Sequence, residues 1–381
     1  MPEKLIRIRD RQTGGYDVRV GRSILATEAL YVPARARRAL LVSNPKVDGL
    51  YGRTVERELR RRGMAVGRWL MSDGERFKSL RSAERLLAAA SEFGLSRTDF
   101  IVALGGGVVG DLAGFAAAIY LRGVGYLQVP TTLLAMIDSS VGGKTGVNLP
   151  SGKNLVGAFH QPAAVAVDTT VLATLDRREL RAGLCEAVKH AALAGGRLFG
   201  STERFLEKYG VDDFARLASD ERFADDLTEL LAAQIAYKAS IVSRDPHEAT
   251  DRTDARSRKV LNLGHTVGHA LEKITGYRKL RHGEAVGYGL RAVFHLSKNL
   301  EILSADELES LRGILRRVGP LPSLPNINPS QVLEAISYDK KSIDGSVQWV
   351  LLAGIGKPVI RSSSEIPRRA VTDAIRSILK S

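Results

Sequence analysis

The chain of 381 residues has a single cysteine, few aromatic residues and no long apolar run. Cys185 alone cannot form an internal disulfide or a cysteine-rich zinc site, and one thiol fits a reducing compartment. No run of about 18 uncharged apolar residues occurs, so we expect no membrane span. The opening residues MPEKLIRIRDRQ are charged throughout and lack the apolar stretch of a secretory signal. We therefore expect a globular protein of the cytoplasm.

Acidic residues are also scarce, because 42 Asp and Glu stand against 56 Lys and Arg and leave a net charge of +14. Residues 1–70 alone contain 16 basic and 7 acidic side chains. The run Arg60–Arg62 falls late in a helical pattern, where basic groups suit the helix dipole. Aromatic residues are only 6% of the chain and no nucleic-acid-binding motif is present. We therefore expect a solvated basic face, no nucleic-acid partner, and room for an anionic substrate.

The hydrophobic pattern changes near residue 174. Before it, apolar strands alternate with helices, which predicts a parallel sheet covered by helices. We expect a hairpin of strands 5–9 and 16–20, further strands at 39–42, 65–71, 100–104 and 125–129, and helices at 48–62, 82–92 and 108–118. Beyond it, helical periodicity dominates at 225–243, 265–274, 285–300 and 305–318, and only 347–352 looks extended. We predict an α/β protein with an N-terminal Rossmann-like parallel-sheet domain (1–174), a mostly α-helical C-terminal domain (175–381), and an active site in the cleft between them.

A glycine loop, Gly105–Asp111 (GGGVVGD), lies between a predicted strand and a predicted helix and matches the pattern G-x-G-x-x-G. Glycines there allow a pyrophosphate to approach the backbone at a helix N-terminus. The loop follows a late strand rather than the first, unlike the usual dinucleotide fingerprint. From spacing alone, a tight turn with Asp111 complementing the helix dipole is an equal alternative.

A second segment, from Pro130 to Asn154, combines small residues, hydroxyls, amides and the lysines Lys144 and Lys153. We interpret it as a loop that exposes its backbone and could hold anionic groups. The Gly-Gly-Lys-Thr stretch lacks the four-residue spacer of a P-loop, so that motif is excluded. A flexible surface loop is the simpler alternative.

Histidines form a third signal. His265 and His269 are four residues apart and share a face if the segment is helical, and His282 follows closely. Glu186 lies upstream in LCEAVKH. Two imidazoles and a carboxylate suffice for a catalytic zinc that keeps an open position, although a helical pair of histidines alone is as often structural.

Taken in order, these segments resemble the 3-dehydroquinate synthase family of the sugar phosphate cyclase superfamily. The resemblance covers the chain from about residue 38 to about residue 355 and depends on the order and spacing of eight motifs: Asp73–Lys78, Gly105–Asp111, Tyr120–Asn148, Ser151–Pro162, Leu184–His190, Leu261–His269, Arg281–Gly289 and Asp339–Lys341. The segment between Lys238 and Arg258 departs from the family pattern, since it is longer and more polar here.

The resemblance implies three groups of site residues. Zinc, or cobalt in its place, would be bound by Glu186, His265 and His282. The NAD-binding residues would be Asp73, Gly74, Glu75, Arg76, Phe77, Lys78, Gly107, Val108, Val109, Gly110, Asp111, Thr131, Thr132, Lys144, Lys153, Val171, Leu172, Ala173 and Thr174. The substrate would be bound by Arg122, Lys144, Lys153, Asn154, Arg258, Asn262 and Lys341, with Asp138, Lys189, Lys238 and His269 as catalytic residues.

The implied reaction converts 3-deoxy-D-arabino-heptulosonate 7-phosphate to 3-dehydroquinate and phosphate, the second step of the shikimate pathway to chorismate and the aromatic amino acids. It proceeds by transient oxidation with NAD, phosphate elimination, re-reduction and ring closure. The family also implies a homodimer in which Arg122 enters from the partner subunit. Alternatives are a cyclase that makes a valiolone- or deoxy-inosose-type ring, or a metal-dependent polyol dehydrogenase of similar architecture.

Overall fold

The computed structural model describes residues 3–9, 14–27, 30–249, 251–340 and 346–379. Two compact units are present, one comprising residues 1–175 and 215–239 and the other residues 176–214 and 240–381. Helix α8 (Glu221–Val242) therefore belongs to the first unit as far as Ala239. Among the helices within the described ranges, not one combines the length and the apolar composition that crossing a membrane requires.

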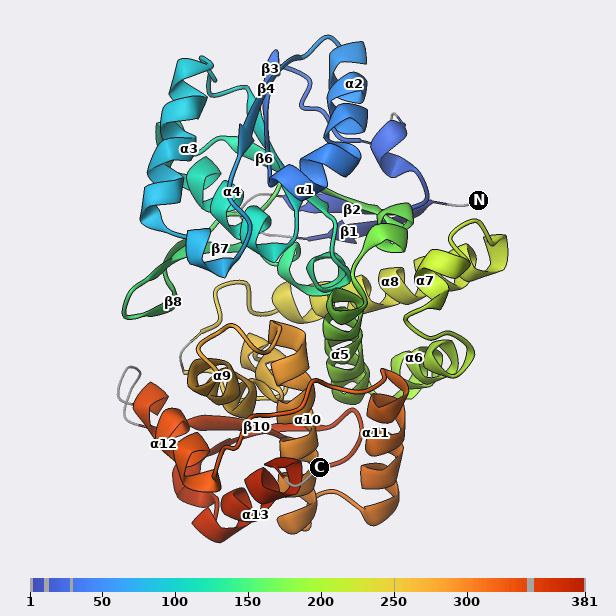
Figure 1. The fold of residues 1–381 in the computed structure, drawn as a ribbon, viewed down its shortest axis with the longest axis vertical. Helices are drawn as coiled ribbons and strands as arrows, with labels where there is room; N and C mark the ends of the chain where they lie inside the picture. Colours follow the sequence, from blue (N-terminus) through green and yellow to red (C-terminus); the bar gives the residue numbers. More distant parts are fainter. Residues whose placement is uncertain (1–2, 10–13, 28–29, 250, 341–345, 380–381) are drawn as a thin grey trace. The chain divides into compact units, whose positions relative to one another are not determined.

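A seven-stranded sheet forms the centre of the first unit (Figure 1), with the strand order β1-β2-β9-β6-β5-β3-β4. Only β1 is antiparallel to its neighbour, β2, and the other pairs are parallel. The strands are β1 (Lys4–Ile8), β2 (Tyr16–Gly21), β3 (Arg38–Ser43), β4 (Ala65–Leu70), β5 (Phe100–Gly105), β6 (Gly125–Pro130) and β9 (Ala164–Asp168). The predicted parallel sheet and the opening hairpin are thus confirmed, and β9 is a strand that the sequence pattern did not indicate.

Helices cover this sheet because each buries one apolar side. Leu86 and Ala90 of α3 and Leu112 of α4 pack with Leu40 and Ile101 of the strands in one core. Figure 1 shows α2 on the opposite side of these strands from α3. The helical segments of this unit, besides α8, are α1 (Pro45–Val47), a π-helical turn η2 (Asp48–Gly52), α2 (Arg53–Arg61), α3 (Leu80–Glu92), α4 (Gly107–Ile119) and the turns η1 (Ile24–Ala26), η3 (Glu75–Phe77), η4 (Tyr120–Arg122), η5 (Ala135–Ser139) and η6 (Thr169–Thr174).

The segment from Lys144 to Phe159 forms an antiparallel hairpin, β7 (Lys144–Leu149) and β8 (Gly152–Phe159). This corrects the interpretation of residues 130–154 as a loop throughout. Gly146 and Gly157 face each other in the hairpin, and a Cβ on Gly157 would lie 2.2 Å from the carbonyl oxygen of Thr145. Gly146, one of the glycines that suggested a loop, is thus needed here for close approach of two backbones.

The second unit is mostly helical, as predicted. Its helices are α5 (Arg177–Ala194), α6 (Gly196–Lys208), α9 (His265–Ile274), α10 (His282–Asn299), α11 (Ala305–Arg317), α12 (Pro329–Lys340) and α13 (Arg368–Leu379), with α7 (Asp213–Arg216) at the boundary and a 3₁₀ turn η7 at Arg258–Asn262. A small antiparallel pair, β10 (Gln348–Leu352) and β11 (Pro358–Ser362), completes it. The expectation of one extended segment was wrong, because β10 needs β11 to satisfy its backbone hydrogen bonds.

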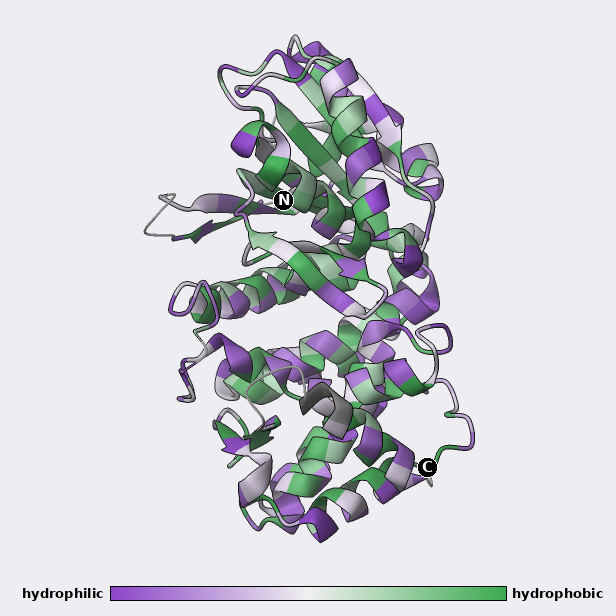
Figure 2. Cartoon of the chain, turned by 90° about the vertical axis from the view of Figure 1, so that its left-hand side faces the viewer, coloured by the Kyte–Doolittle hydropathy of each residue, from purple (hydrophilic) through white to green (hydrophobic). Residues whose placement is uncertain are grey.

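Hydropathy explains why the helices of both units pack as they do. In Figure 2 they carry hydrophobic and hydrophilic residues side by side, as expected of helices that bury one face. Helix α10 departs from this pattern, since it is buried along most of its length, including Glu284. A carboxylate that is not exposed at all needs a partner, which for Glu284 is Arg178 on α5.

Candidate functional site

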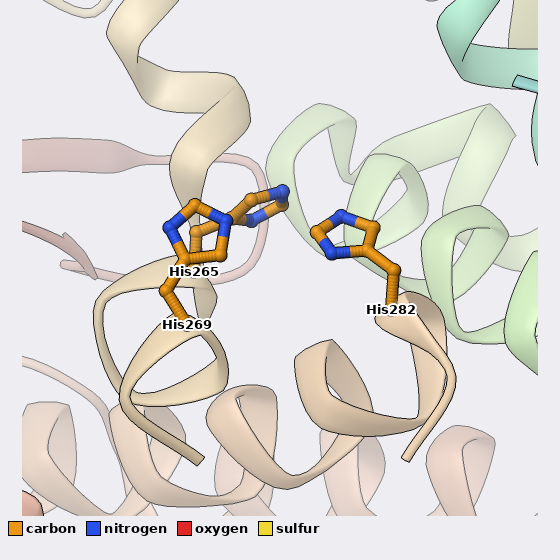
Figure 3. A group of neighbouring side chains, drawn as sticks. All are labelled: His265, His269 and His282. Atoms are coloured by element: carbon orange, nitrogen blue, oxygen red, sulfur yellow. The ribbon is translucent and has the colours of Figure 1, made fainter. Parts of the chain in front are cut away.

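Three imidazoles converge in the second unit (Figure 3). His265 and His269 lie one turn apart on α9, and His282 is the first residue of α10. One ring nitrogen from each lies within 4.8 Å of the others, and the ring centroids of His265 and His282 are 5.2 Å apart. Such spacing suits a shared cation, because neutral imidazole nitrogens are metal ligands at about 2.0–2.1 Å.

A buried carboxylate adjoins the histidines. Glu186, on α5, has no solvent exposure, and its Oε1 lies 3.5 Å from Nε2 of His282. Lys189 Nζ is 2.6 Å from the other oxygen, yet neither oxygen of Glu186 accepts a hydrogen bond from a residue in the described ranges. Lys189 already places one positive charge beside Oε2, whereas Oε1 faces His282, so a further positive group at Oε1 would lower the cost of burying this carboxylate.

The histidines are oriented as metal ligands usually are. Nδ1 of His282 faces Oε2 of Glu272 at 3.2 Å, and Nδ1 of His265 faces the carbonyl oxygen of Leu263 at 3.3 Å. Both contacts leave Nε2 available, which is the arrangement that carboxylates and carbonyls impose on metal-binding histidines. Two ligands of a tetrahedral zinc lie about 3.4 Å apart, close to the separation between Glu186 and His282. The residues present therefore fit a divalent metal.

Burial of Cys185, beside Glu186 on α5, raises the pKa of its thiol far above the ordinary value. The thiol stays protonated at neutral pH and packs against α10, where a Cβ on Gly287 would lie 2.9 Å from Sγ. Cys185 is thus a packing residue, as expected for a small side chain pointing away from the Glu186 face.

Arg258 and Asn262 occupy the turn η7, at the end of the long link that begins after α8. Asp245 accepts hydrogen bonds from the backbone N–H of Ala249 and of Arg258, each at 2.8 Å. Burial acts to raise the pKa of Asp245, but these hydrogen bonds outweigh it and hold the pKa below the ordinary value. Arg258 Nη1 donates to the carbonyl of Pro246 at 2.9 Å, so the link itself positions the guanidinium. Lys341 lies outside the described residues.

In the sheet of the first unit, β4 and β5 lie on opposite sides of β3, so the strand order reverses at β3. Ligands of such sheets bind where the strand order reverses, beyond the carboxyl ends of the strands. Ser43 ends β3 and donates a hydrogen bond to Leu104 O in β5 at 2.8 Å, and the Gly105–Asp111 loop follows directly. The glycine loop predicted from sequence therefore lies at the switch point of the sheet.

Close packing, rather than unusual dihedral angles, requires these glycines. A Cβ on Gly110 would lie 2.7 Å from Oε1 of Gln128 on β6, and one on Gly107 would lie 3.0 Å from Oγ of Ser139. None of Gly105, Gly106, Gly107 and Gly110 has a positive φ. This corresponds to the role of the third glycine of a dinucleotide fingerprint, which brings helix and strand together.

Several predicted nucleotide residues meet at one place in this unit. Lys78 Nζ donates to Oδ2 of Asp111 and to Oδ1 of Asn154. Asn148 Nδ2 donates to Oε1 of Glu75 at 2.8 Å, which ties the Asp73–Lys78 loop to the β7–β8 hairpin. Burial raises the pKa of Asp111, although Lys78 acts in the opposite direction. Elsewhere in this unit, Lys238 Nζ donates to the Asp138 carboxylate.

Each predicted residue can be assigned to a unit. The first unit contains the residues from the nucleotide and anion motifs: Asp73–Lys78, Gly107–Asp111, Arg122, Thr131, Thr132, Asp138, Lys144, Lys153, Asn154, Val171–Thr174 and Lys238. The second contains Glu186, Lys189, Arg258, Asn262, His265, His269 and His282.

Sequence reasoning missed several residues beside these. Glu272 shares the α9 face of His265 and His269 at helical spacing, a signal that was available. Tyr51, in η2, hydrogen-bonds to Thr174 Oγ1 and to Val171 O, and Asn44 Nδ2 lies 3.4 Å from Asp73 Oδ1. No spacing rule connects these last pairs, since the chain segments are far apart.

Solved structures with this fold include sugar phosphate cyclases. A 2-deoxy-scyllo-inosose synthase, solved with carbaglucose-6-phosphate, NAD+ and Co2+, matches with a TM-score of 0.84 and 25% identity over 99% of both chains. The 2-epi-5-epi-valiolone synthase from Streptomyces hygroscopicus subsp. jinggangensis 5008, solved with NAD+ and Zn2+, matches with a TM-score of 0.83 and 27% identity. The match covers 98% of this chain and 99% of the other. A glycerol dehydrogenase from Schizosaccharomyces pombe matches with a TM-score of 0.64 and 17% identity, over 94% of this chain and 88% of the other. At this identity the two share the fold alone.

Sequence comparison identifies the family within this class. Family models for 3-dehydroquinate synthase match residues 68–182 (N-terminal) and 183–342 (C-terminal). The 3-dehydroquinate synthases of Nostoc sp. (strain PCC 7120 / SAG 25.82 / UTEX 2576) and Gloeobacter violaceus (strain ATCC 29082 / PCC 7421) are 41% and 42% identical, over 90% and 91% of this chain and 90% of each relative. The chain belongs to the 3-dehydroquinate synthase family, and the resemblance seen in the motifs is confirmed.

Proposed function

We propose that the chain converts 3-deoxy-D-arabino-heptulosonate 7-phosphate to 3-dehydroquinate and phosphate, with NAD and a divalent metal, zinc or cobalt. It is then a carbon–oxygen lyase of the shikimate pathway. The observation that carries the proposal is the approach of Glu186 Oε1 to His282 Nε2, 3.5 Å apart, in a chain of this family. The solved cyclases of this fold that contain NAD+ with Co2+ or Zn2+ support the cofactors.

The metal ligands in this proposal are Glu186, His265 and His282. A divalent metal held there supplies a Lewis acid that lowers the pKa of a substrate hydroxyl, and bound NAD supplies reversible hydride acceptance. Glu272 and the Leu263 carbonyl fix the imidazole rings for this task. His269 faces the same space from the next turn of α9 and is assigned to the substrate.

The nucleotide in this proposal lies at the carboxyl edge of β3 and β5. The N-terminus of α4, at Gly107, presents unpaired N–H groups of its first turn to the pyrophosphate. Its remaining contacts would come from the Asp73–Lys78 loop, Asp111, Thr131, Thr132, Lys144, Lys153 and the Val171–Thr174 turn. The first unit then acts as an NAD-binding domain and the second as a metal- and substrate-binding domain.

The substrate carries a carboxylate and a phosphate, so cationic and amide side chains suit it. Lys153, Asn154 and Arg258 are assigned to the carboxylate. Lys144, Asn262, His269 and Lys341 are assigned to the phosphate, with Arg122 from the partner subunit of a homodimer. Asp138, Lys189 and Lys238 are assigned to the ring hydroxyls, where the Lys238–Asp138 pair can donate from Nζ and accept at the carboxylate. We place the protein in the cytoplasm, without a nucleic-acid partner.

The test is release of phosphate from the heptulosonate phosphate with NAD present in catalytic amount. We expect turnover without accumulation of NADH, because the ketone formed is reduced again in the same cycle. Removal of the metal with a chelator should abolish turnover, and adding back Zn2+ or Co2+ should restore it. The control is the same protein incubated with a chelator already saturated with metal.

Two results would contradict the proposal. Turnover of sedoheptulose 7-phosphate, with none of the heptulosonate phosphate, would assign the chain to the valiolone-type cyclases. A steady accumulation of NADH, one per substrate consumed, would identify a polyol dehydrogenase. Both assays use the same preparation, so a folding failure cannot be mistaken for either.

A further inference from the structure

One face of helix α5 contacts three consecutive residues of α10. Arg178, Ala182 and Glu186 are four residues apart and therefore share a face of the helix. They contact Glu284, Gly283 and His282 respectively. The proposed ligands Glu186 and His282 thus stand at one end of a row of contacts, and Arg178 and Glu284 stand at the other.

The Arg178–Glu284 pair has the geometry of a strong ion pair. Nε of Arg178 donates to Oε1 of Glu284 at 2.8 Å, and Nη2 donates to Oε2 at 2.7 Å. Two parallel hydrogen bonds fix orientation as well as distance. Nη2 also donates to the carbonyl of Lys279 at 2.9 Å, and Oε2 of Glu284 accepts from the backbone N–H of Arg281 at 2.8 Å. Arg178 therefore holds both the start of α10 and the turn that precedes it.

The middle contact leaves no room for adjustment. A Cβ on Gly283 would lie 2.0 Å from the carbonyl oxygen of Ala182, so the two backbones touch at this point. If α10 pivots on this contact at Gly283, a change at Arg178 alters the angle between α5 and α10. His282, the first residue of α10, then changes its distance from Glu186.

We propose that Arg178, through Glu284, is a positioning residue for the metal site, because it sets the separation of His282 from Glu186. This inference rests on the proposed metal ligands. Arg178 touches none of the three histidines and, by this proposal, acts on metal affinity through the position of α10. Its loss should weaken metal binding in the way that loss of an outer-shell partner does, about 10–100-fold.

The experiment measures Co2+ binding to metal-free protein by competition with a chelator, together with the visible absorption band of bound Co2+. We expect Arg178→Gln to weaken affinity about 10–100-fold and to shift the band. Arg178→Lys keeps the charge but not the paired hydrogen bonds, so it should lose about 3–10-fold. This partial rescue separates positioning from charge alone.

Two controls match the test. Arg177→Gln removes the neighbouring arginine of α5, whose partner is the exposed Asp212, and should stay within about twofold of wild type. Ser297, farther along α10, accepts a buried hydrogen bond from the Leu352 N–H. Ser297→Ala removes this bond and should lower stability without changing Co2+ affinity. Circular dichroism confirms that each variant is folded, and if Arg178→Gln is not folded, Arg178→Lys decides.

Wild-type affinity and an unshifted band in a folded Arg178 variant would overturn the proposal. So would an equal loss in Ser297→Ala, which would trace the effect to stability. The readout needs no substrate. A protein that does not turn over the heptulosonate phosphate, yet loses Co2+ affinity only in the Arg178 variants, would contradict the proposed reaction and support the positioning role.

Discussion

Among single residues, His269 is the one whose geometry admits two roles. One of its ring nitrogens lies within 4.8 Å of those of His265 and His282, so distance alone makes it a possible ligand. The family resemblance assigns it to the substrate phosphate instead. Exposure agrees with a substrate role, because His269 is the exposed member of the three.

Replacement of each histidine by alanine separates these roles. We expect His265→Ala and His282→Ala to lose the metal on desalting, since each removes one of the three proposed protein ligands. His269→Ala should keep the metal and lose phosphate release. Metal content is measured by atomic absorption on the same samples used for turnover. A His269→Ala protein that alone lost its metal would reverse the ligand assignment.

Asp99 is a second residue whose environment makes a quantitative prediction. Its carboxylate accepts from the backbone N–H groups of Arg37, Arg38 and Ser96, each at 2.8 Å, and so ties the start of β3 to that of β5. Burial acts to raise the pKa of Asp99, but these hydrogen bonds outweigh it and leave the pKa below the ordinary value. A lowered pKa in the folded state stabilises the fold above the unfolded-state pKa.

Asp99→Asn should therefore lower the free energy of unfolding by about 1–3 kcal/mol near neutral pH, because an amide N–H would face a backbone donor. As the pH falls below the unfolded-state pKa of aspartate, about 3.9, toward the lower pKa of the folded state, this stabilisation is lost and the difference should shrink. Urea unfolding of both proteins from pH 7 down to pH 3 measures this. A difference that grows toward low pH would contradict the assigned pKa direction.

The residues that sequence reasoning could find were those whose chemistry is visible in a motif. His265, His269 and His282 stand out within eighteen residues, and the structure brings their rings together. Arg178 and Glu284 were not found, because a charged pair 106 residues apart in sequence is indistinguishable from two surface charges until α5 and α10 pack. The burial of Glu284, which makes its pairing with Arg178 important, is a property of the fold.

At the scale of elements, the link between α8 and η7 is the segment that the sequence motifs set apart as longer and more polar than the family pattern. In the described part of this link, one carboxylate holds the backbone. Asp245 is buried and accepts from two backbone N–H groups, one of them that of Arg258. The link is thus supported by hydrogen bonds of its own, and one of them reaches the backbone of Arg258.

Asp245→Asn should impair substrate binding through Arg258, if Arg258 binds the substrate carboxylate as proposed. One backbone N–H would lose its acceptor, and a loss of this kind corresponds to about a tenfold rise in KM, with kcat and metal content nearly unchanged. Asp254→Asn is the matched control, since Asp254 is exposed and accepts from Arg256 N in the same link. Equal effects in both variants would show that the link, rather than Asp245, matters.

Elements with strong periodicity were predictable, and the others were not. The strands of the parallel sheet up to β6 are apolar runs that local pattern identifies. Strands β7 and β8 contain glycine and polar residues, and they become strands because Gly146 and Gly157 let the two backbones meet. Pairing of this kind depends on context rather than on propensity.

At the scale of the whole molecule, the proposed homodimer makes Arg122 a residue that binds the substrate of the partner subunit. Leu121 and Arg122 both have positive φ, 48° and 66°, and Gly123 follows at 121°. Two consecutive non-glycine residues in this region are strained, and such strain concentrates at functional sites. The Arg122 side chain is exposed and makes no hydrogen bond or ion pair with another residue in the described part of its own chain.

If Arg122 completes the site of the partner subunit, two inactive variants should restore activity when they share a dimer. Arg122→Ala and Lys153→Ala alter different protomers of a mixed dimer, which leaves one site with both residues intact. Random mixing makes half of the dimers mixed, so we expect about a quarter of wild-type phosphate release after co-refolding or co-expression. Each variant alone, and the two mixed without subunit exchange, are the controls. If Arg122 served its own subunit, no dimer would contain an intact site and the mixture would stay inactive.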